Sequence, residues 1–154
     1  MVYIRQTTQS QKVLLKLDLK NAFNSIRRDT VLQTAQTHLP EIHPFIWDCY
    51  SSKTSFFYGE FCLDSATGVQ QGDPLDPALF ALAIHGVTSE VKSDLNVWYL
   101  DDGCIGGDLQ TVLSNAAIIS NGLSSVGLEI NNSKCELLIV NNTTSQEQSQ
   151  TTKI

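Results

Sequence analysis

The pattern of apolar and polar residues divides the chain into short strand-like runs and longer helical segments. Short apolar runs bounded by turn-forming residues are typical of buried strands. Aromatic residues on both sides of Gly59 predict a hairpin over residues 53–64, with its turn near that glycine. The strands predicted outside the hairpin are 12–19, 96–100, 104–107 and the end of 128–140.

The helical segments have recognisable start and stop residues. Asp29 or Thr30 is expected to cap a helix that ends before Pro40, because a short polar side chain accepts the free N–H groups of a first turn. Asp73 is expected to cap another helix, with Pro74 at its first position. The predicted helices are 31–39, 41–52, 74–93 and 109–126, the last ended by Gly127, with a turn or short helix at 21–29.

Strands mixed with paired helices predict an α+β fold, in which helices pack on one face of a small antiparallel sheet. The 154 residues are enough for one domain with a moderate core. We divide the chain into a polar segment at 1–12, a folded domain at 13–140 and a tail at 141–154. The tail has almost no apolar residues and is expected to be disordered.

Composition narrows the cellular context. No apolar run reaches the roughly 18 residues that a membrane helix needs. The start MVYIRQTTQSQK lacks the apolar stretch of a secretory signal, so we expect an intracellular protein of the cytoplasm or nucleus without a membrane partner. The four cysteines are scattered without a CxxC pair, which argues against a zinc site and for reduced thiols.

Charge is distributed unevenly along the chain. Residues 1–28 hold six basic residues and one acid, whereas the remainder holds four basic and fifteen acidic residues. A net charge of -6 argues against an extended nucleic-acid-binding surface. The asymmetry fits a site where carboxylates face cations, and it equally fits an ordinary acidic protein.

Three aspartates mark a candidate metal site. Asp18 ends the first predicted strand, and Asp101 and Asp102 occupy the turn between two others. If these strand ends are adjacent, the three carboxylates converge and require either protonation or divalent cations, for which magnesium or manganese is the suitable choice. The alternative is structural, since Asp-Asp-Gly is a common turn sequence and a strand-terminal aspartate often serves as a cap.

Four segments resemble, in their order, the catalytic palm of reverse transcriptases. They are KLDLKNAFNSI, GVQQGDPLDPALFALAI, NVWYLDDG and GLEINNSKCELLIV, within residues 13–140. The resemblance is specific because QGDPL and YLDDG occur together, and it is nearest to retrotransposon enzymes of the non-long-terminal-repeat type. It implies an RNA-directed DNA polymerase, a nucleotidyltransferase that adds deoxynucleoside triphosphates to a DNA primer on an RNA template.

The resemblance assigns catalytic roles to several residues. Asp18 matches the first metal-binding aspartate, and Asp101 and Asp102 match the aspartate pair that follows Tyr99 by two residues. It implies two magnesium ions, with manganese as a substitute. Asp18 and Asp101 are the expected direct ligands, Asp102 supports them, and the backbone of Leu19 is a further candidate ligand.

Other positions match the parts of such enzymes that contact the nucleotide. Phe23 matches the residue that excludes a ribose 2′-hydroxyl, although a core aromatic is the alternative interpretation. Gln71 and Gly72 match the pair that approaches the new base pair. Lys134 matches a lysine that protonates the pyrophosphate leaving group, and a solvated surface lysine is its alternative.

The chain also departs from the pattern. Asp76 stands where similar sequences carry a small residue, and it adds negative charge near the expected nucleotide. Fingers and thumb regions are expected to be absent from this chain, which suggests a fragment of a retroelement polyprotein that is inactive alone. Two other hypotheses are a catalytically silent, domesticated palm that acts as a binding or scaffold module, and an RNA-copying polymerase.

Overall fold

The computed structural model describes residues 11–140 and 151–153, which form helices, a five-stranded sheet and a separate two-stranded hairpin. The strands are β1 (Lys12–Asp18), β2 (Thr54–Tyr58), β3 (Phe61–Ser65), β4 (Leu95–Tyr99), β5 (Asp102–Asp108), β6 (Glu136–Val140) and β7 (Thr151–Lys153). The helices are α1 (Ala22–Ser25), α2 (Arg28–His38), α3 (His43–Tyr50), α4 (Asp76–Ser89) and α5 (Leu109–Ser125).

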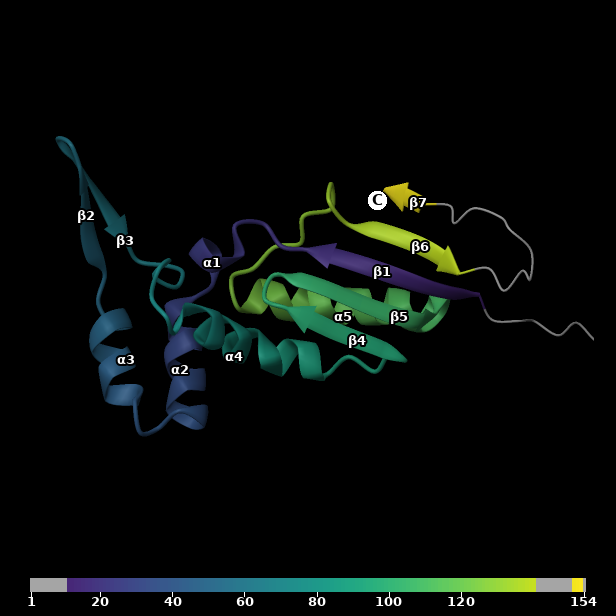
Figure 1. Cartoon of the computed structure of the whole chain (residues 1–154), viewed down its shortest axis with the longest axis horizontal. Coiled ribbons are helices and arrows are strands. Elements are labelled where there is room, and N and C mark those ends of the chain that lie inside the picture. The colour runs from purple at the N-terminus through teal and green to yellow at the C-terminus, as the bar shows by residue number, and fades with distance from the viewer. Residues whose placement is uncertain (1–10, 141–150, 154) are drawn as a thin grey trace, which may run out of the picture.

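Strand β1 lies at the centre of the five-stranded sheet, whose order is β4-β5-β1-β6-β7 (Figure 1). It pairs antiparallel with both β5 and β6. Its alternating sequence buries Val13, Leu15 and Leu17, whereas Lys12 and Lys16 are exposed. This alternation is what a strand with one covered face requires.

Helices α4 and α5 supply the cover for that face of the sheet (Figure 1). Helix α5 buries Val112, Ile119 and Leu123 completely, and α4 does the same with Phe80. The predicted α+β architecture, a small antiparallel sheet with helices on one face, is thereby confirmed.

The predicted hairpin over residues 53–64 is also confirmed, as β2 and β3. Gly59 lies in its turn with a φ of 59°, a conformation that favours glycine. Figure 1 shows the hairpin extending away from the five-stranded sheet. Phe57, Tyr58 and Phe61 near its end are each at least 70% exposed, so the hairpin contributes little to the core.

Arg28 anchors the base of this hairpin to the body of the protein. Its side chain is buried and donates to the backbone carbonyl oxygens of Ser65 (2.8 Å) and Gly68 (3.1 Å). A buried guanidinium is tolerated only where its N–H groups are satisfied, which these carbonyls achieve.

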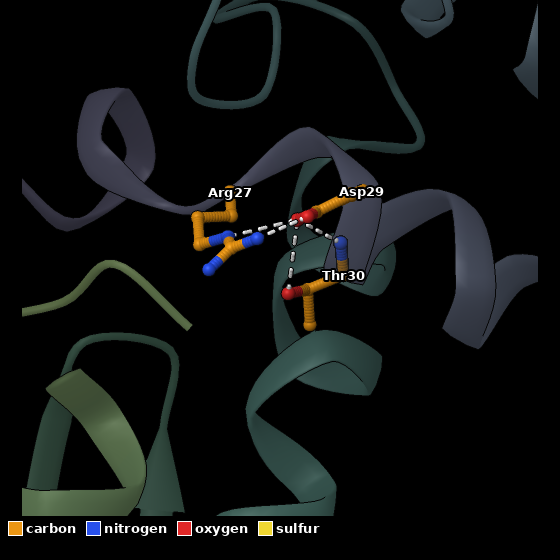
Figure 2. Close-up of polar contacts among 3 residues, drawn as sticks. All are labelled: Arg27, Asp29 and Thr30. Atoms are coloured by element: carbon orange, nitrogen blue, oxygen red, sulfur yellow. Dashed lines mark hydrogen bonds and ion pairs between the residues drawn. The ribbon is translucent and has the colours of Figure 1, made fainter. Parts of the chain in front are cut away.

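The start of α2 differs from the prediction. The helix begins at Arg28, and neither Asp29 nor Thr30 is its N-cap. Figure 2 shows instead that the Asp29 carboxylate bonds to the guanidinium of Arg27 and accepts the backbone N–H of Thr30 at 2.7 Å. The hydrogen bonds from Arg27 lower the pKa of Asp29 from its ordinary value.

The start of α4 was also predicted too early. The helix begins at Asp76, and the proline in its first turn is Pro77 rather than Pro74. The Asp73 carboxylate accepts the backbone N–H of Leu75 at 2.9 Å, so it closes a turn that precedes the helix. By contrast, the end of α5 agrees with the prediction, since Gly127 follows it with a φ of 85°.

The predicted disordered tail falls mostly outside the described residues. Residues 151–153 depart from that prediction, because they form β7 and pair with β6. Residues 1–10, 141–150 and 154 lie outside the described part, so most of the polar N-terminal segment does as well. Within the described ranges no helix has both the length and the apolar character of a membrane span. All four cysteines are free.

Gly68→Ala tests how closely the loop before α4 approaches α1. Gly68 has a φ of 76°, and an added Cβ would lie 2.5 Å from the carbonyl oxygen of Phe23. We expect a loss of about 2 kcal/mol or more in the free energy of unfolding, measured by urea titration.

The matched control is Gly86→Ala in α4, where an added Cβ meets nothing within 4 Å. Alanine should stabilise that helix by up to about 1 kcal/mol. Equal effects of the two substitutions would contradict the close approach at Gly68.

Candidate active site

The ends of the two central strands bring two of the predicted carboxylates together. Asp18 is the last residue of β1 and pairs directly with Asp102, the first residue of β5. Directly opposed residues of antiparallel strands point to the same face, with Cβ atoms about 4.5–5.5 Å apart. Lys16 and Cys104 form the preceding pair on this face, which the helices leave uncovered.

The turn between β4 and β5 consists of Leu100 and Asp101, since Tyr99 pairs with Asp102. The turn predicted over residues 101–103 therefore lies earlier, with only Asp101 of the three in it, and the return strand is longer than predicted because it runs from Asp102 to Asp108. Leu100 has a φ of 56°, which is strained for a leucine. Strain of this kind is tolerated where the surrounding structure imposes it, often at functional sites.

Gly103 is required by packing against a tryptophan. A Cβ at this position would lie 2.6 Å from the ring of Trp98. The indole N–H of Trp98 donates to the side-chain oxygen of Asn96 at 2.9 Å, and the Asn96 amide donates to the carbonyl of Thr88 at 2.8 Å. These bonds fix the turn that carries Asp101 relative to the end of α4.

Asp18 and Asp101 line one polar cavity of about 290 Å³. The cavity therefore combines side chains from the end of β1, the β4–β5 turn, α1 and the loops that follow β3 and α5. The predicted site residues that line it are Asp18, Leu19, Phe23, Gln71, Asp101 and Lys134. Asn21, Ala22 and Asn24 complete the lining and were not predicted.

Asp102 and Gly72 lie outside this cavity. Asp102 lines a neighbouring, mainly apolar groove on the uncovered face, together with Tyr99. Within residues 11–140 and 151–153, no three His, Cys, Asp or Glu side chains lie close enough to hold one metal ion. The predicted convergence of all three carboxylates thus needs correction: two share the cavity, and Asp102 lies beside Asp18 but faces the groove.

Asn131 holds Asp18 in place and was missed by the sequence analysis. Its side-chain amide donates to Oδ1 of Asp18 at 3.1 Å, and its backbone N–H donates to the Asp18 carbonyl at 2.8 Å. Ser133 orients the amide by donating to its oxygen at 2.7 Å. The signal was present in the quoted segment GLEINNSKCELLIV, three residues before Lys134.

Lys134 brings positive charge to the same carboxylate. Its Nζ lies 3.7 Å from Oδ1 of Asp18, while its side chain is 68% exposed and that of Asp18 is 18% exposed. An exposed ion pair of this length contributes little to stability. The ammonium group is therefore free to move toward another anion in the cavity.

Leu19 pairs with the segment that carries Asn131. Leu19 and Ile130 form an antiparallel bridge, whose two hydrogen bonds of 2.9 and 2.8 Å use backbone groups of the residues on either side. The carbonyl oxygen of Leu19 takes no part in those two bonds. Its predicted role as a backbone ligand is compatible with this pairing.

Phe23 lies between the core and the cavity. Its ring stacks on Phe80 with centroids 4.6 Å apart and an interplanar angle of 18°, so it belongs to the core. The residue is only partly buried and also lines the cavity that contains Asp18. A residue in this position can limit the size of what enters.

Gln71 and Gly72 lie on the loop that faces α1. The Gln71 side-chain amide donates to the Asn24 side-chain oxygen at 3.2 Å. Gly72 has a φ of 99°, and a Cβ there would meet nothing within 4 Å. The glycine is explained by its backbone conformation, and the space in front of it is open.

The carboxylate at Asp76 is buried, contrary to the expectation of charge presented to a nucleotide. Only 4% of the residue is exposed, and its Oδ1 accepts the Tyr50 hydroxyl at 3.1 Å. Burial raises the pKa of Asp76 from its ordinary value.

The donor set of the cavity suits a hard divalent cation. Carboxylate oxygens of Asp18 and Asp101, and a nearby backbone carbonyl, are the ligands that magnesium or manganese prefers. Such ions usually keep several waters and complete their shell with substrate phosphates. A protein site of two carboxylates is compatible with that mode of binding.

Comparison with protein families identifies the class. The model of the family described as reverse transcriptase (RNA-dependent DNA polymerase) matches residues 2–153, so the chain belongs to this family. A comparison with curated protein sequences finds no match.

Two solved telomerase structures share the fold. Apo telomerase from Candida tropicalis, truncated from its C-terminal domain, aligns with 97% of this chain and 36% of its own, at 12% identity and a TM-score of 0.57. Telomerase from Candida albicans, in complex with a TWJ fragment of telomeric RNA, aligns with 88% of this chain and 28% of its own, at 15% identity and a TM-score of 0.53. This chain thus spans about a third of the length of those proteins.

Gly103→Ala should disturb the β4–β5 turn through Trp98. Overpacking of a fitted site typically costs about 1–3 kcal/mol, and we expect a loss of this size in the free energy of unfolding. The substitution is made in a Trp47→Phe background, so that Trp98 alone reports by fluorescence. An unchanged Trp98 emission together with unchanged stability would contradict the packing described for Gly103.

Proposed function

We propose that this chain is the catalytic palm of an RNA-directed DNA polymerase that adds deoxynucleotides to a primer 3′-hydroxyl. The observation that carries the proposal is the shared cavity of Asp18 and Asp101, with Phe23 and Gln71 in its wall. Family membership supports the reaction class. An RNA template, a DNA primer and deoxynucleoside triphosphates are the corresponding partners.

Asp18 and Asp101 are the residues that would hold magnesium, with the Leu19 carbonyl as an additional oxygen and Asp102 in support from the neighbouring groove on the same face. Two bound ions supply charge stabilisation for the attacking and leaving oxygens of phosphoryl transfer. Asn131 fixes the rotamer of Asp18 through its hydrogen bond and so sets the position of that ligand.

Lys134 is proposed as the general acid of the reaction. Its Nζ carries the proton, and the exposed side chain can turn from Asp18 toward the pyrophosphate leaving group. A positioned acid that protonates a leaving oxygen contributes typically about 10²–10⁴-fold in rate.

Phe23 is proposed to select deoxynucleotides. Its ring is held by Phe80 and therefore cannot yield easily to a ribose 2′-hydroxyl. This feature favours a DNA-making enzyme over an RNA-copying polymerase. The assignment to a retroelement of the non-long-terminal-repeat type rests on the motifs QGDPL and YLDDG.

With this chain grafted between the fingers and thumb of a working reverse transcriptase, Asp18→Asn and Asp101→Asn should each abolish primer extension on an RNA template. Because the carboxylates are proposed to hold ions that stabilise the transition state by several kcal/mol, we expect losses of about 100-fold or more. Asp48→Asn, an exposed aspartate on α3, is the matched control and should extend like the parent chain.

Extension that survives Asp18→Asn or Asp101→Asn would overturn the site assignment. If the chain binds Mn²⁺ through these two residues but the grafted chain never extends a primer, the catalytically silent binding module becomes the better description. Binding is measured by electron paramagnetic resonance of Mn²⁺, which does not require turnover.

Phe23→Val should relax the choice of sugar. Removing the ring opens space for a 2′-hydroxyl, and we expect the preference for deoxynucleotides over ribonucleotides to fall by roughly tenfold or more. Ile119→Val in α5 is the control, since it loosens the core without touching Phe23 or its stacking partner. Equal loss of preference in both variants would show that core packing, and not the ring at Phe23, sets the selectivity.

A further inference from the structure

A buried pair of polar side chains joins α3 to the start of α4. Tyr50 is the last residue of α3 and is 2% exposed, and Asp76 is the first residue of α4 and is 4% exposed. The Tyr50 hydroxyl donates to Oδ1 of Asp76 at 3.1 Å. A carboxylate in such a place is costly unless its oxygens are satisfied, so its presence calls for an explanation.

The Tyr50 hydroxyl makes a second bond, to the loop between the two helices. It accepts the backbone N–H of Gln70 at 3.1 Å, and the Gln70 side chain donates to the Cys49 carbonyl, also at 3.1 Å. Burial raises the pKa of Tyr50 to about 12, so the hydroxyl keeps its proton and remains a donor at ordinary pH. One hydroxyl group therefore links Asp76 to Gln70.

Gln70 and Asp76 lie on either side of the turn that carries Gln71 and Gly72. The backbone N–H of Asp73 donates to the Gln70 carbonyl at 3.0 Å, and the N–H of Asp76 donates to the Asp73 carbonyl at 3.1 Å. The backbone N–H groups of Gly72 and Asp73 partly oppose the rise in the pKa of Asp76 that burial causes. The turn is thus restrained at both ends by backbone hydrogen bonds and by the buried Tyr50 hydroxyl.

The turn forms part of the wall of two cavities. Gln71 lines the cavity that contains Asp18 and Asp101. Gln71, Gly72, Asp73 and Asp76 line a second cavity of about 410 Å³, and Phe23 borders both. A shift of the turn would therefore change the catalytic cavity directly.

Arg28 holds the tyrosine ring in this arrangement. Its guanidinium lies 5.6 Å from the centroid of the Tyr50 ring and also bonds to the carbonyl of Gly68, which begins the same loop. A cation over an aromatic face is attractive. Asp73 is the acidic group that acts on both Tyr50 and Asp76, and its like charge raises the pKa of each.

We propose that Tyr50 and Asp76 are positioning residues, which hold the Gln70–Asp73 turn so that Gln71 and Gly72 face the nucleotide. A small residue such as serine, of the kind that similar sequences carry at position 76, would have a shorter side chain with a single oxygen. The carboxylate of Asp76 reaches the Tyr50 hydroxyl, which in turn accepts the N–H of Gln70 at the start of the turn. The catalytic part of this inference rests on the proposed function, whereas the restraint on the turn does not.

Amide hydrogen exchange followed by NMR tests the restraint without any need for activity. Tyr50→Phe and Asp76→Ala should each speed exchange at residues 70–72 by about tenfold or more, since a buried bond to a charged group is lost or broken. Asp76→Asn retains an acceptor for Tyr50 and should stay within about threefold of the parent chain. The double variant Tyr50→Phe/Asp76→Ala should exchange little faster than the more affected single variant, because both substitutions break the same hydrogen bond.

Ile119→Val in α5 is the control, since it loosens the core without touching the turn. It should change exchange at residues 70–72 and in β1 alike. The proposal is overturned if Tyr50→Phe and Asp76→Ala affect 70–72 no more than β1, or if their effects multiply in the double variant. If Asp76→Ala does not fold, Tyr50→Phe compared with Asp76→Asn decides by the same criterion.

Single-nucleotide kinetics then test the catalytic part. In Asp76→Ala the KM for the deoxynucleotide should rise about tenfold or more, with a smaller change in kcat, and Asp76→Asn should restore it. A grafted chain without polymerase activity would refute the proposed function, while the exchange result on the chain itself still decides the restraint. Faster exchange at 70–72 with an unchanged KM would overturn the positioning role alone.

Discussion

The pairing of β1 with β5 on one side and β6 on the other is the constraint on which the structure depends. One face of β1 inserts Val13, Leu15 and Leu17 into the core beneath α5. The register of the same strand places Asp18 opposite Asp102 on the uncovered face. Because side chains alternate along a strand, a slip of one residue would bury the carboxylate and expose the core. The backbone hydrogen bonds of β1 therefore determine both the burial of the core residues and the position of Asp18 in the candidate site.

The rest of the site is built from loops that are tied to this frame. Asn21 and Leu100 are the non-glycine residues with positive φ among the described parts of the chain, and each lies beside the cavity or next to Asp101. The loop with Gln71 is held from several directions, by the approach of Gly68 to α1 and by the buried hydroxyl of Tyr50. Loops restrained in this way can present polar groups to a ligand without the loss of order that free loops incur on binding.

The predictions succeeded where local pattern and chemistry agree. The apolar runs, the hairpin around Gly59 and the helix stop at Gly127 each follow from a few neighbouring residues. They failed where a side chain prefers another partner: Asp29 bonds to Arg27 instead of capping α2, and Asp73 closes a turn ahead of α4. A cap can be predicted from residue type, but the competing partner lies in the geometry.

The sequence by itself determined the α+β class, the membership in the reverse transcriptase family and the identity of the candidate ligands Asp18 and Asp101. These depend on periodicity and on motifs that are continuous along the chain. Only the tertiary structure decided that Asp102 faces a neighbouring groove, that Asn131 holds Asp18, and that Asp76 is buried against Tyr50. The two contacts join residues far apart in the chain, and the position of Asp102 depends on which face of the sheet the helices leave open. Local spacing along the sequence encodes neither kind of information.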